Sequence, residues 1–313
     1  MAVAALTYPE AIVIGLLQGV TELFPVSSLG HSVLIPAIIG GRWARDLSLG
    51  GDQSPYLTFL VAVHVATAVA LVVFFRHDWV RIVRGLFTSL HDRRISTADQ
   101  RLAWLLIVAT IPVGIAGLLF EHVVRTALGK PLPASIFLIL NGVMLAVVER
   151  LKSRAPVLVP AVAGQDEQGR AYYRSVEDTE SGSDQRLAAQ SWKQATLIGA
   201  AQILALLPGI SRSGATMGAG LLRGLSHEDA ARFAFLLATP VIAAAGVLKL
   251  PELAGPTGQA VLGQVLAGSV VAGLAAYGSL RFLTRYFETR TLNPFAVYCV
   301  VAGLVGFAWT ATH

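Results

Sequence analysis

The chain has few charged residues and almost no cysteine. Charged side chains make up 14% of its 313 residues, well below the roughly 25% that is typical of soluble domains. The one cysteine, Cys299, excludes an internal disulfide and lies in an apolar run, which favours a packing role. The sequence has no Walker motif, no G-x-G-x-x-G turn after a strand and no H-E-x-x-H pair, so these patterns give no sign of nucleotide binding or zinc catalysis. No basic cluster precedes the first apolar run, so we expect no cleavable signal peptide.

Long apolar runs are what the chain has instead. Hydrophobic residues make up 54% of it, and six runs are each about long enough to cross a bilayer, which takes roughly 17–25 residues. These runs cover residues 59–75, 102–120, 136–148, 233–250, 261–280 and 294–310. We therefore predict an all-α polytopic membrane protein with about six spanning helices, forming a single integral membrane domain over residues 1–313.

The arginines are concentrated in two of the loops, 76–101 and 281–290. The positive-inside bias places these loops in the cytoplasm, and it makes the net charge of +5 a topology signal rather than a nucleic-acid-binding feature. Counting spans outward from them, 121–133 and 251–259 lie outside. The polar loop 149–194 then lies inside, and its composition between 165 and 190 predicts disorder.

Two polar stretches, 18–32 and 202–216, share a layout at an offset of 184 residues. The matching pairs are Ile14 and Ile198, Gly15 and Gly199, Gln18 and Gln202, Ser27 and Ser211, and Gly30 and Gly214. By the loop count one stretch starts outside and the other inside. This predicts an inverted-topology repeat with two re-entrant helix hairpins that meet near the bilayer midplane. Repeat one covers about 9–150, the polar cytoplasmic loop about 152–190, and repeat two about 191–311.

Each stretch is interrupted by a proline, Pro25 or Pro208, which ends the helix before it. Serines follow both prolines and can cap a new helix. The first stretch places Gln18 and Glu22 four residues apart, on one helical face. An ionisable group at membrane depth is costly and usually functional. Glu22 is therefore a candidate cation ligand or acid–base group, or alternatively the structural partner of an arginine.

Ser27, Ser28 and His31 follow Pro25. If a helix restarts there, Ser28 and His31 are three residues apart and can meet, which would give an activated nucleophile. The simpler alternatives are that the serines are helix caps and that His31 is a hydrogen-bonded core histidine. His64 and Thr67, in the middle of a span, can face the same cavity or form a helix–helix hydrogen bond.

The second stretch begins a helix with small residues and one arginine. Exposed amides at a helix N-terminus attract anions, and a guanidinium suits bidentate binding of phosphate. The candidate diphosphate-binding residues are Ser211, Arg212, Ser213, Gly214 and Thr216. The alternative is that Arg212 is the structural partner of Glu22.

On these motifs the chain resembles the bacterial undecaprenyl-diphosphate phosphatases, the bacitracin-resistance family. The segments that carry the resemblance are QGVTE at 18–22, PVSSLGH at 25–31 and PGISRSGAT at 208–216. The resemblance implies hydrolysis of undecaprenyl diphosphate to undecaprenyl phosphate and inorganic phosphate, which recycles the cell-wall lipid carrier and confers bacitracin resistance. It also implies a divalent cation (Mg²⁺ or Ca²⁺) and a multi-pass location in the bacterial plasma membrane, with a site open to the outer face.

Carried onto this chain, the resemblance gives the site as Glu22, Ser27, Ser28, His31, Ser211, Arg212 and Thr216. Together with the residue patterns above, this predicts three sets: catalytic Glu22, Ser27, Ser28, His31 and Arg212; diphosphate-binding Ser211, Arg212, Ser213, Gly214 and Thr216; and metal-binding Glu22 and Gln18. Some positions depart from the family pattern. Gln18 stands where many members have Glu, His64 where members often have Gln, and Tyr298-Cys299 where a Tyr-Arg pair is common. These departures leave the preferred prenyl chain open.

A second function from another class also fits the pattern. Inverted repeats with broken helices at the midplane are a transporter design, so a transporter or flippase of a polyprenyl phosphate or small anion is the alternative. The serine–histidine cluster favours the enzyme, because a transporter needs an anion site but no nucleophile. The expected partners are a polyprenyl diphosphate and membrane lipid, without nucleic acid. The oligomeric state is left open, with a homodimer as one option.

Overall fold

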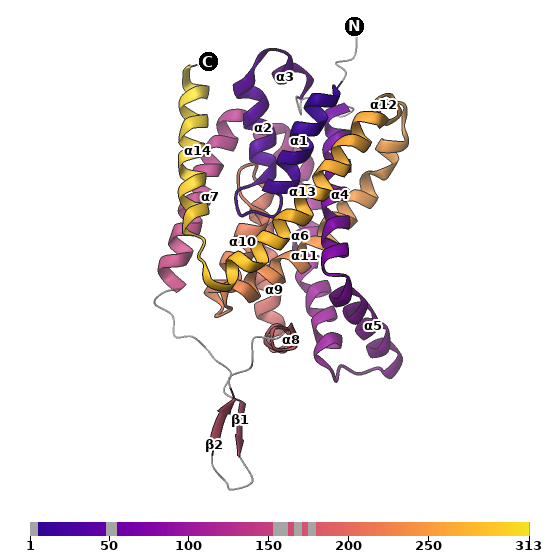
Figure 1. Ribbon diagram of the computed structural model, residues 1–313, viewed down its shortest axis with the longest axis vertical. Coiled ribbons are helices and arrows are strands. Elements are labelled where there is room, and N and C mark those ends of the chain that lie inside the picture. Colours follow the sequence, from indigo (N-terminus) through magenta and orange to yellow (C-terminus); the bar gives the residue numbers. More distant parts are fainter. Residues whose placement is uncertain (1–5, 48–54, 153–161, 166–170, 175–179, 313) are drawn as a thin grey trace.

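The structure is a computed structural model that describes residues 6–47, 55–152, 162–165, 171–174 and 180–312. Its described part is an all-α membrane protein with one short strand pair (Figure 1). Six helices among the described residues are long and apolar enough to span a bilayer, in agreement with the predicted number. They are α4 (Pro55–Phe74), α6 (Ala98–Leu128), α7 (Pro131–Lys152), α11 (His227–Ala254), α13 (Leu262–Thr289) and α14 (Asn293–Thr312).

Two broken helices accompany these spans. The first broken helix consists of α1 (Tyr8–Thr21), the turn 22–27 and α2 (Ser28–Ile39). The second consists of α9 (Trp192–Ala200), the 3₁₀ helix η1 (Ala201–Leu206), the turn 207–211 and α10 (Arg212–Leu222). The helices stop before Pro25 and Pro208, as the sequence predicts. Each second half is capped by a serine: Ser27 Oγ accepts from the Gly30 N–H at 3.2 Å, and Ser211 Oγ accepts from the Gly214 N–H at 3.1 Å.

The remaining elements lie at the two ends of the molecule. In Figure 1, α12 (Pro256–Ala260), α3 (Gly41–Asp46), the start of α1 and the end of α14 are at one end. The opposite end holds α5 (Arg76–Asp92), α8 (Glu180–Ala188) and the antiparallel pair β1 (Val162–Gln165) and β2 (Ala171–Arg174). The first broken helix lies toward the end with α3 and α12, and α9 and α10 lie toward the other end. The connection from α13 to α14 also lies toward that other end. The loops with many arginines, 76–101 and 281–290, therefore share one end, as the charge pattern predicts.

Each broken helix begins with a helix that packs against a spanning helix of the other half of the chain. Helix α1 packs against α13, and α9 packs against α6. Glycines allow both contacts: a Cβ on Gly15 would lie 3.0 Å from Gly268 Cα, and a Cβ on Gly199 would lie 2.7 Å from Ala109 Cα. Close backbone approach at small residues is typical of packed membrane helices. Helices α4 and α11 pack on each other, as do α7 and α14.

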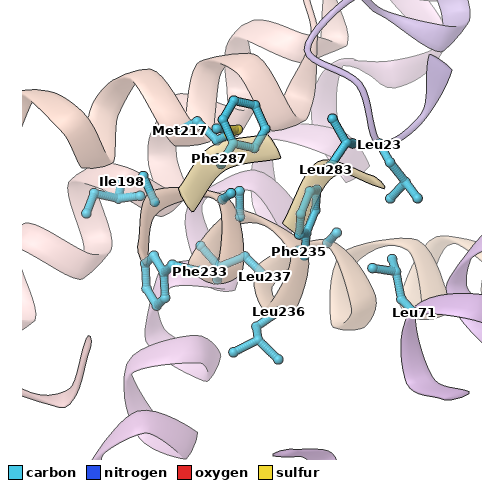
Figure 2. Packing of buried hydrophobic residues seen from close by; sticks show 14 of the residues in the cluster. Leu23, Leu71, Ile198, Met217, Phe233, Phe235, Leu236, Leu237, Leu283 and Phe287 are labelled. Carbon is cyan, nitrogen blue, oxygen red and sulfur yellow. The ribbon is translucent and has the colours of Figure 1, made fainter. Parts of the chain in front are cut away.

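A hydrophobic core lies beside the two breaks and fixes their surroundings. Figure 2 shows side chains from several elements in this core, with Phe233, Phe235 and Leu237 of α11 beside Leu283 and Phe287 of α13. Leu23, in the turn of the first broken helix, belongs to the same cluster and is fully buried. The turn is therefore anchored by apolar contacts at the residue next to Glu22.

The prediction of disorder between residues 165 and 190 is wrong for the part that the structure describes. Helix α8 packs on α6 and α11, and Asp184 forms ion pairs of 2.7 Å with both Arg81 and Arg232. Burial raises the pKa of the Asp184 carboxyl, although the two arginines act in the opposite direction. Composition alone could not reveal these pairs, because they join α8 to α5 and α11, which are distant in sequence. Residues 166–170 and 175–179 lie outside the described residues.

Candidate active site

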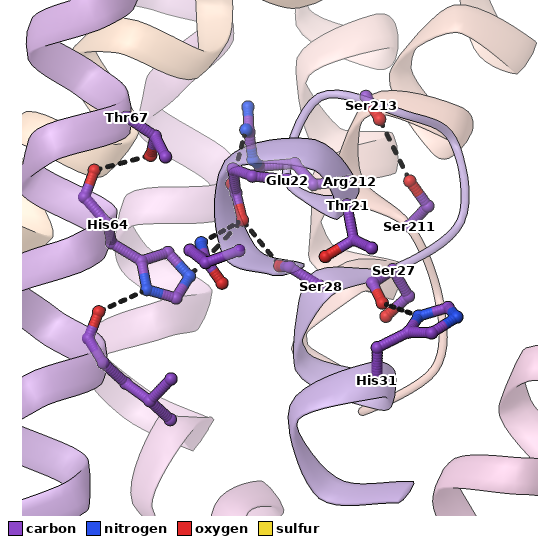
Figure 3. A network of polar contacts seen from close by, with 12 residues as sticks. Thr21, Glu22, Ser27, Ser28, His31, His64, Thr67, Ser211, Arg212 and Ser213 are labelled. Carbon is purple, nitrogen blue, oxygen red and sulfur yellow. Dashed lines mark hydrogen bonds and ion pairs between the residues drawn. The ribbon is translucent and has the colours of Figure 1, made fainter. Parts of the chain in front are cut away.

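Glu22 is the centre of the candidate site, immediately after the last residue of α1 (Figure 3). Its carboxylate is buried, and its two oxygens contact four side chains. Arg212 Nη2 donates to Oε1 at 2.8 Å. Ser28 Oγ donates to Oε2 at 2.6 Å, Gln18 Nε2 donates to Oε2 at 3.0 Å, and His64 Nε2 lies 3.4 Å from the same oxygen. The site therefore combines groups from α1, α2, α4 and α10.

The pair between Glu22 and Arg212 joins the two broken helices. Burying a charge is tolerated when it is paired and hydrogen-bonded, and here each broken helix supplies one of the two charges. This is the contact that the structural alternative for Arg212 expects. The guanidinium is not fully used, because Arg212 Nη1 is buried without a hydrogen-bond partner. Arg212 therefore has an open donor beside a carboxylate that it already holds.

The predicted contact between Ser28 and His31 is wrong. Ser28 is the first residue of α2 and points toward Glu22, whereas His31 points away from it (Figure 3). His31 Nδ1 lies 2.7 Å from the Ser27 carbonyl oxygen, and Nε2 lies 2.8 Å from the Tyr298 hydroxyl. The reason is that α14 supplies a hydroxyl for the imidazole, while Glu22 draws the Ser28 hydroxyl to the other side.

The carbonyl contact fixes one hydrogen of His31. A carbonyl oxygen can only accept, so Nδ1 carries a hydrogen. Nε2 shares a hydrogen bond with the Tyr298 hydroxyl, which can donate or accept. Ser27 takes a backbone φ of 69°, which is uncommon for a residue other than glycine. Its side chain caps α2. The cap role considered for Ser27 is therefore present, and its carbonyl additionally positions His31.

The remaining residues of the second motif hold α10 in place. Ser213 Oγ donates to the Phe24 carbonyl oxygen at 3.1 Å, which ties α10 to the first break. Thr216 Oγ1 donates to the Arg212 carbonyl oxygen in its own helix at 2.7 Å. Gly214 lies against Pro25, with 3.2 Å between the position of a Cβ and Pro25 Cβ. Of the predicted diphosphate-binding residues, Arg212 is the one whose side chain reaches Glu22.

Four other residues near the site received little or no weight from the sequence. His64 contacts Glu22 through Nε2 and the Leu60 carbonyl oxygen through Nδ1 at 2.7 Å. Thr67 bonds within its own helix, to the His64 carbonyl oxygen. Tyr298 holds His31, and Asn141 contacts both breaks. The signal that could have found Asn141 is its position as a lone amide within the apolar run 136–148.

The donor set around Glu22 can be compared with the needs of a hard divalent cation. Among the described residues, no group of three or more His, Cys, Asp or Glu side chains is arranged to hold a metal ion. However, Gln18 Oε1 is buried without a hydrogen-bond partner, next to the Glu22 carboxylate. Mg²⁺ is usually held by one or two carboxylates together with phosphate oxygens of a substrate. The Glu22 carboxylate and Gln18 Oε1 fit this pattern, in which the protein supplies only some of the oxygen ligands.

Comparison with known proteins shows which family the chain belongs to. The model of the family described as bacitracin resistance protein BacA matches residues 11–305. The chain belongs to this family. It is 61% identical over 310 residues to an undecaprenyl-diphosphatase of Mycolicibacterium paratuberculosis, covering 98% of this chain and 99% of that protein. An undecaprenyl-diphosphatase 2 of Frankia alni is 56% identical over 330 residues, covering 95% of this chain and 96% of its own length.

A more distant relative widens the comparison beyond these two. The undecaprenyl-diphosphatase of Gluconacetobacter diazotrophicus is 45% identical over 308 residues, with 96% of each chain covered. The residues that match the BacA family, 11–305, run from within α1 to within α14 and include every described element between them. The resemblance stated from the sequence motifs is therefore confirmed over nearly the whole chain.

Proposed function

We propose that this chain hydrolyses undecaprenyl diphosphate to undecaprenyl phosphate and inorganic phosphate, which recycles the lipid carrier of cell-wall synthesis and confers bacitracin resistance. The observation that carries this proposal is the Glu22–Arg212 pair, in which a buried carboxylate and a guanidinium with an open donor meet between two broken helices. The relatives named undecaprenyl-diphosphatase support the same activity.

Substrate binding would begin at Arg212. Its unpartnered Nη1 can donate to a phosphate oxygen, and the planar guanidinium suits bidentate contact with phosphate. The N-terminus of α10 begins at the same residue, and its dipole favours an anion there. A long prenyl chain would stay among the lipids while the diphosphate enters between the broken helices.

Ser28 is the nucleophile that the geometry supports best, with Glu22 rather than His31 as the proton acceptor. The Ser28 hydroxyl already donates to Glu22 Oε2 at 2.6 Å. When the diphosphate draws on Arg212, the carboxylate loses part of its positive partner and accepts a proton more readily. Ser28 Oγ then bonds to the terminal phosphorus, its proton passes to Glu22, and the bond to the bridging oxygen breaks to release undecaprenyl phosphate. Water hydrolyses the phosphoserine to free phosphate.

A divalent cation, Mg²⁺ or Ca²⁺, would be held by Glu22 and Gln18 Oε1 together with substrate oxygens. When bound, it would neutralise charge on the diphosphate. His31 and Ser27 remain part of the proposed site, on the side of α2 that faces away from Glu22. There His31 Nε2 and the Tyr298 hydroxyl form a second polar group near the first break.

The same proposal includes the membrane arrangement. The two broken helices are taken as re-entrant hairpins of an inverted repeat, with halves of about 9–150 and 191–311 in one membrane domain. The end that carries α5 and the strand pair is assigned to the cytoplasm, because the loop 76–101 and the connection after α13 are rich in arginine. The protein would lie in the bacterial plasma membrane, with the site reached from the outer face.

The deciding experiment measures phosphate release from undecaprenyl diphosphate by purified protein in detergent, with and without added Mg²⁺ or Ca²⁺. Turnover is expected, since hydrolysis needs no gradient. A protein that only moves lipid or anions would release no phosphate under these conditions, and that result would reject the enzyme.

A further inference from the structure

Asn141, in the middle of α7, contacts both broken helices at once. Its side chain is fully buried. Nδ2 donates to the Pro25 carbonyl oxygen at 3.0 Å, and Oδ1 accepts from the Ser211 N–H at 3.0 Å. Nδ2 also lies 3.2 Å from Cys299 Sγ on α14. One amide therefore links the break after α1 to the break before α10.

The chemistry of the breaks explains why an amide is required. A helix that stops inside a protein leaves backbone carbonyl and N–H groups without helical partners, and buried groups of this kind need another partner. The Pro25 carbonyl needs a donor, and the Ser211 N–H needs an acceptor. Asparagine supplies both from one planar group, whereas aspartate only accepts and leucine does neither.

The two contacts lie close to the chemistry. Ser211 immediately precedes Arg212, and Pro25 lies three residues from both Glu22 and Ser28. The first turn of α2 is also in direct contact with the second break, since a Cβ on Gly30 would lie 2.9 Å from Gly209 Cα. A change at Asn141 would therefore shift the start of α10 relative to the first break.

We propose that Asn141 is a positioning residue that fixes the N-terminus of α10 against the first break and thereby aligns Arg212 with Glu22 and Ser28. The effect on catalysis rests on the proposed function, whereas the contact itself does not. Misplacement of a binding group by about 1 Å costs about 10²-fold in rate. We expect Asn141→Leu to lower kcat by about 10–100-fold with less than threefold change in KM, because the guanidinium is still present but out of line.

The experiment compares Asn141→Leu and Asn141→Asp with the control Ser135→Ala. Ser135 is also buried on α7, but its hydroxyl bonds to Leu132 in its own helix. Hydrogen–deuterium exchange of the purified proteins is followed in peptides that cover 22–30 and 207–216. Exchange should be faster at both breaks in the leucine variant and unchanged in the control. The aspartate variant should expose mainly 22–30, because it keeps the acceptor for Ser211.

A double variant separates alignment from general loss of structure. In an Arg212→Lys background, Asn141→Leu should lower kcat by less than about threefold, because a lysine makes no bidentate contact to be aligned. The full 10–100-fold loss in both backgrounds, or unchanged exchange at both breaks in the leucine variant, would overturn the proposal. If Asn141→Leu does not fold, the exchange experiment and the double-variant experiment are both made with Asn141→Asp instead. Absence of phosphate release by the wild type would reject the proposed function, while the exchange data would still decide whether Asn141 holds the breaks together.

Discussion

Replacing Arg212 by lysine tests the centre of the candidate site. The lysine ammonium can keep the charge beside Glu22, so the buried carboxylate retains a partner and the protein should fold. It cannot reproduce a planar fork that donates to Glu22 through Nη2 at 2.8 Å and keeps Nη1 free for phosphate. The substitution therefore removes one charged hydrogen bond to the substrate while leaving the fold in place.

The size of the effect follows from that one bond. A hydrogen bond to a charged group contributes about 1.5–3 kcal/mol, and each 1.4 kcal/mol is a factor of about ten. We therefore expect kcat/KM for Arg212→Lys to fall by about 10–150-fold. The matched control is Arg223→Lys, because Arg223 lies just beyond the other end of α10 and is exposed.

The assay is phosphate release from undecaprenyl diphosphate in detergent, with melting temperatures measured for the wild type and both variants. Arg212→Lys should melt near the wild-type temperature and lose activity, whereas the control should change neither. A value of kcat/KM for Arg212→Lys within twofold of wild type would refute the role of Arg212 in gripping the diphosphate.

Three other outcomes are expected. Glu22→Gln keeps the shape of the side chain but removes its charge. The variant should therefore need a much higher cation concentration for activity, or show none. An unchanged cation titration in an active variant would exclude Glu22 as a cation ligand. Ser28→Ala should bind substrate without turnover. Ser27→Ala should lose about 1 kcal/mol of stability with its helix cap and keep measurable turnover. The reverse pattern of turnover would assign the nucleophile to Ser27. A cysteine placed within 121–133 should react with an impermeant thiol reagent from outside intact cells and one within 165–185 should not, while the opposite labelling would invert the assigned orientation.

The parts of the fold that depend on local chemistry could be predicted from the sequence. The apolar runs gave the spans because length and hydropathy decide whether a helix can cross a bilayer. Pro25 and Pro208 marked the breaks because proline removes a backbone donor wherever it occurs. The pairing of Glu22 with Arg212 was also foreseeable, since two opposite charges buried in one apolar protein stabilise each other.

Apart from the Glu22–Arg212 pair, the contacts between distant segments could not be predicted. His31 follows Ser28 by three residues, and helical spacing alone favours their contact. The direction of each side chain is decided instead by Tyr298 on α14 and by Glu22. Likewise, the polar composition around α8 predicts disorder, but Asp184 is held by Arg81, 103 residues away in the sequence. Such pairs leave no periodic signal.

The division of the central ion pair between the two halves has a consequence for how the protein is made. Glu22 and Arg212 are 190 residues apart, and ribosomes add about 5–20 residues per second. The carboxylate is therefore synthesised about 10–40 s before its guanidinium partner. During that interval Gln18, Ser28 and His64, which all belong to the first half, can provide its contacts. The central ion pair can therefore form only after the second broken helix has been synthesised, and a chain truncated after α7 would leave a carboxylate in the membrane without its arginine.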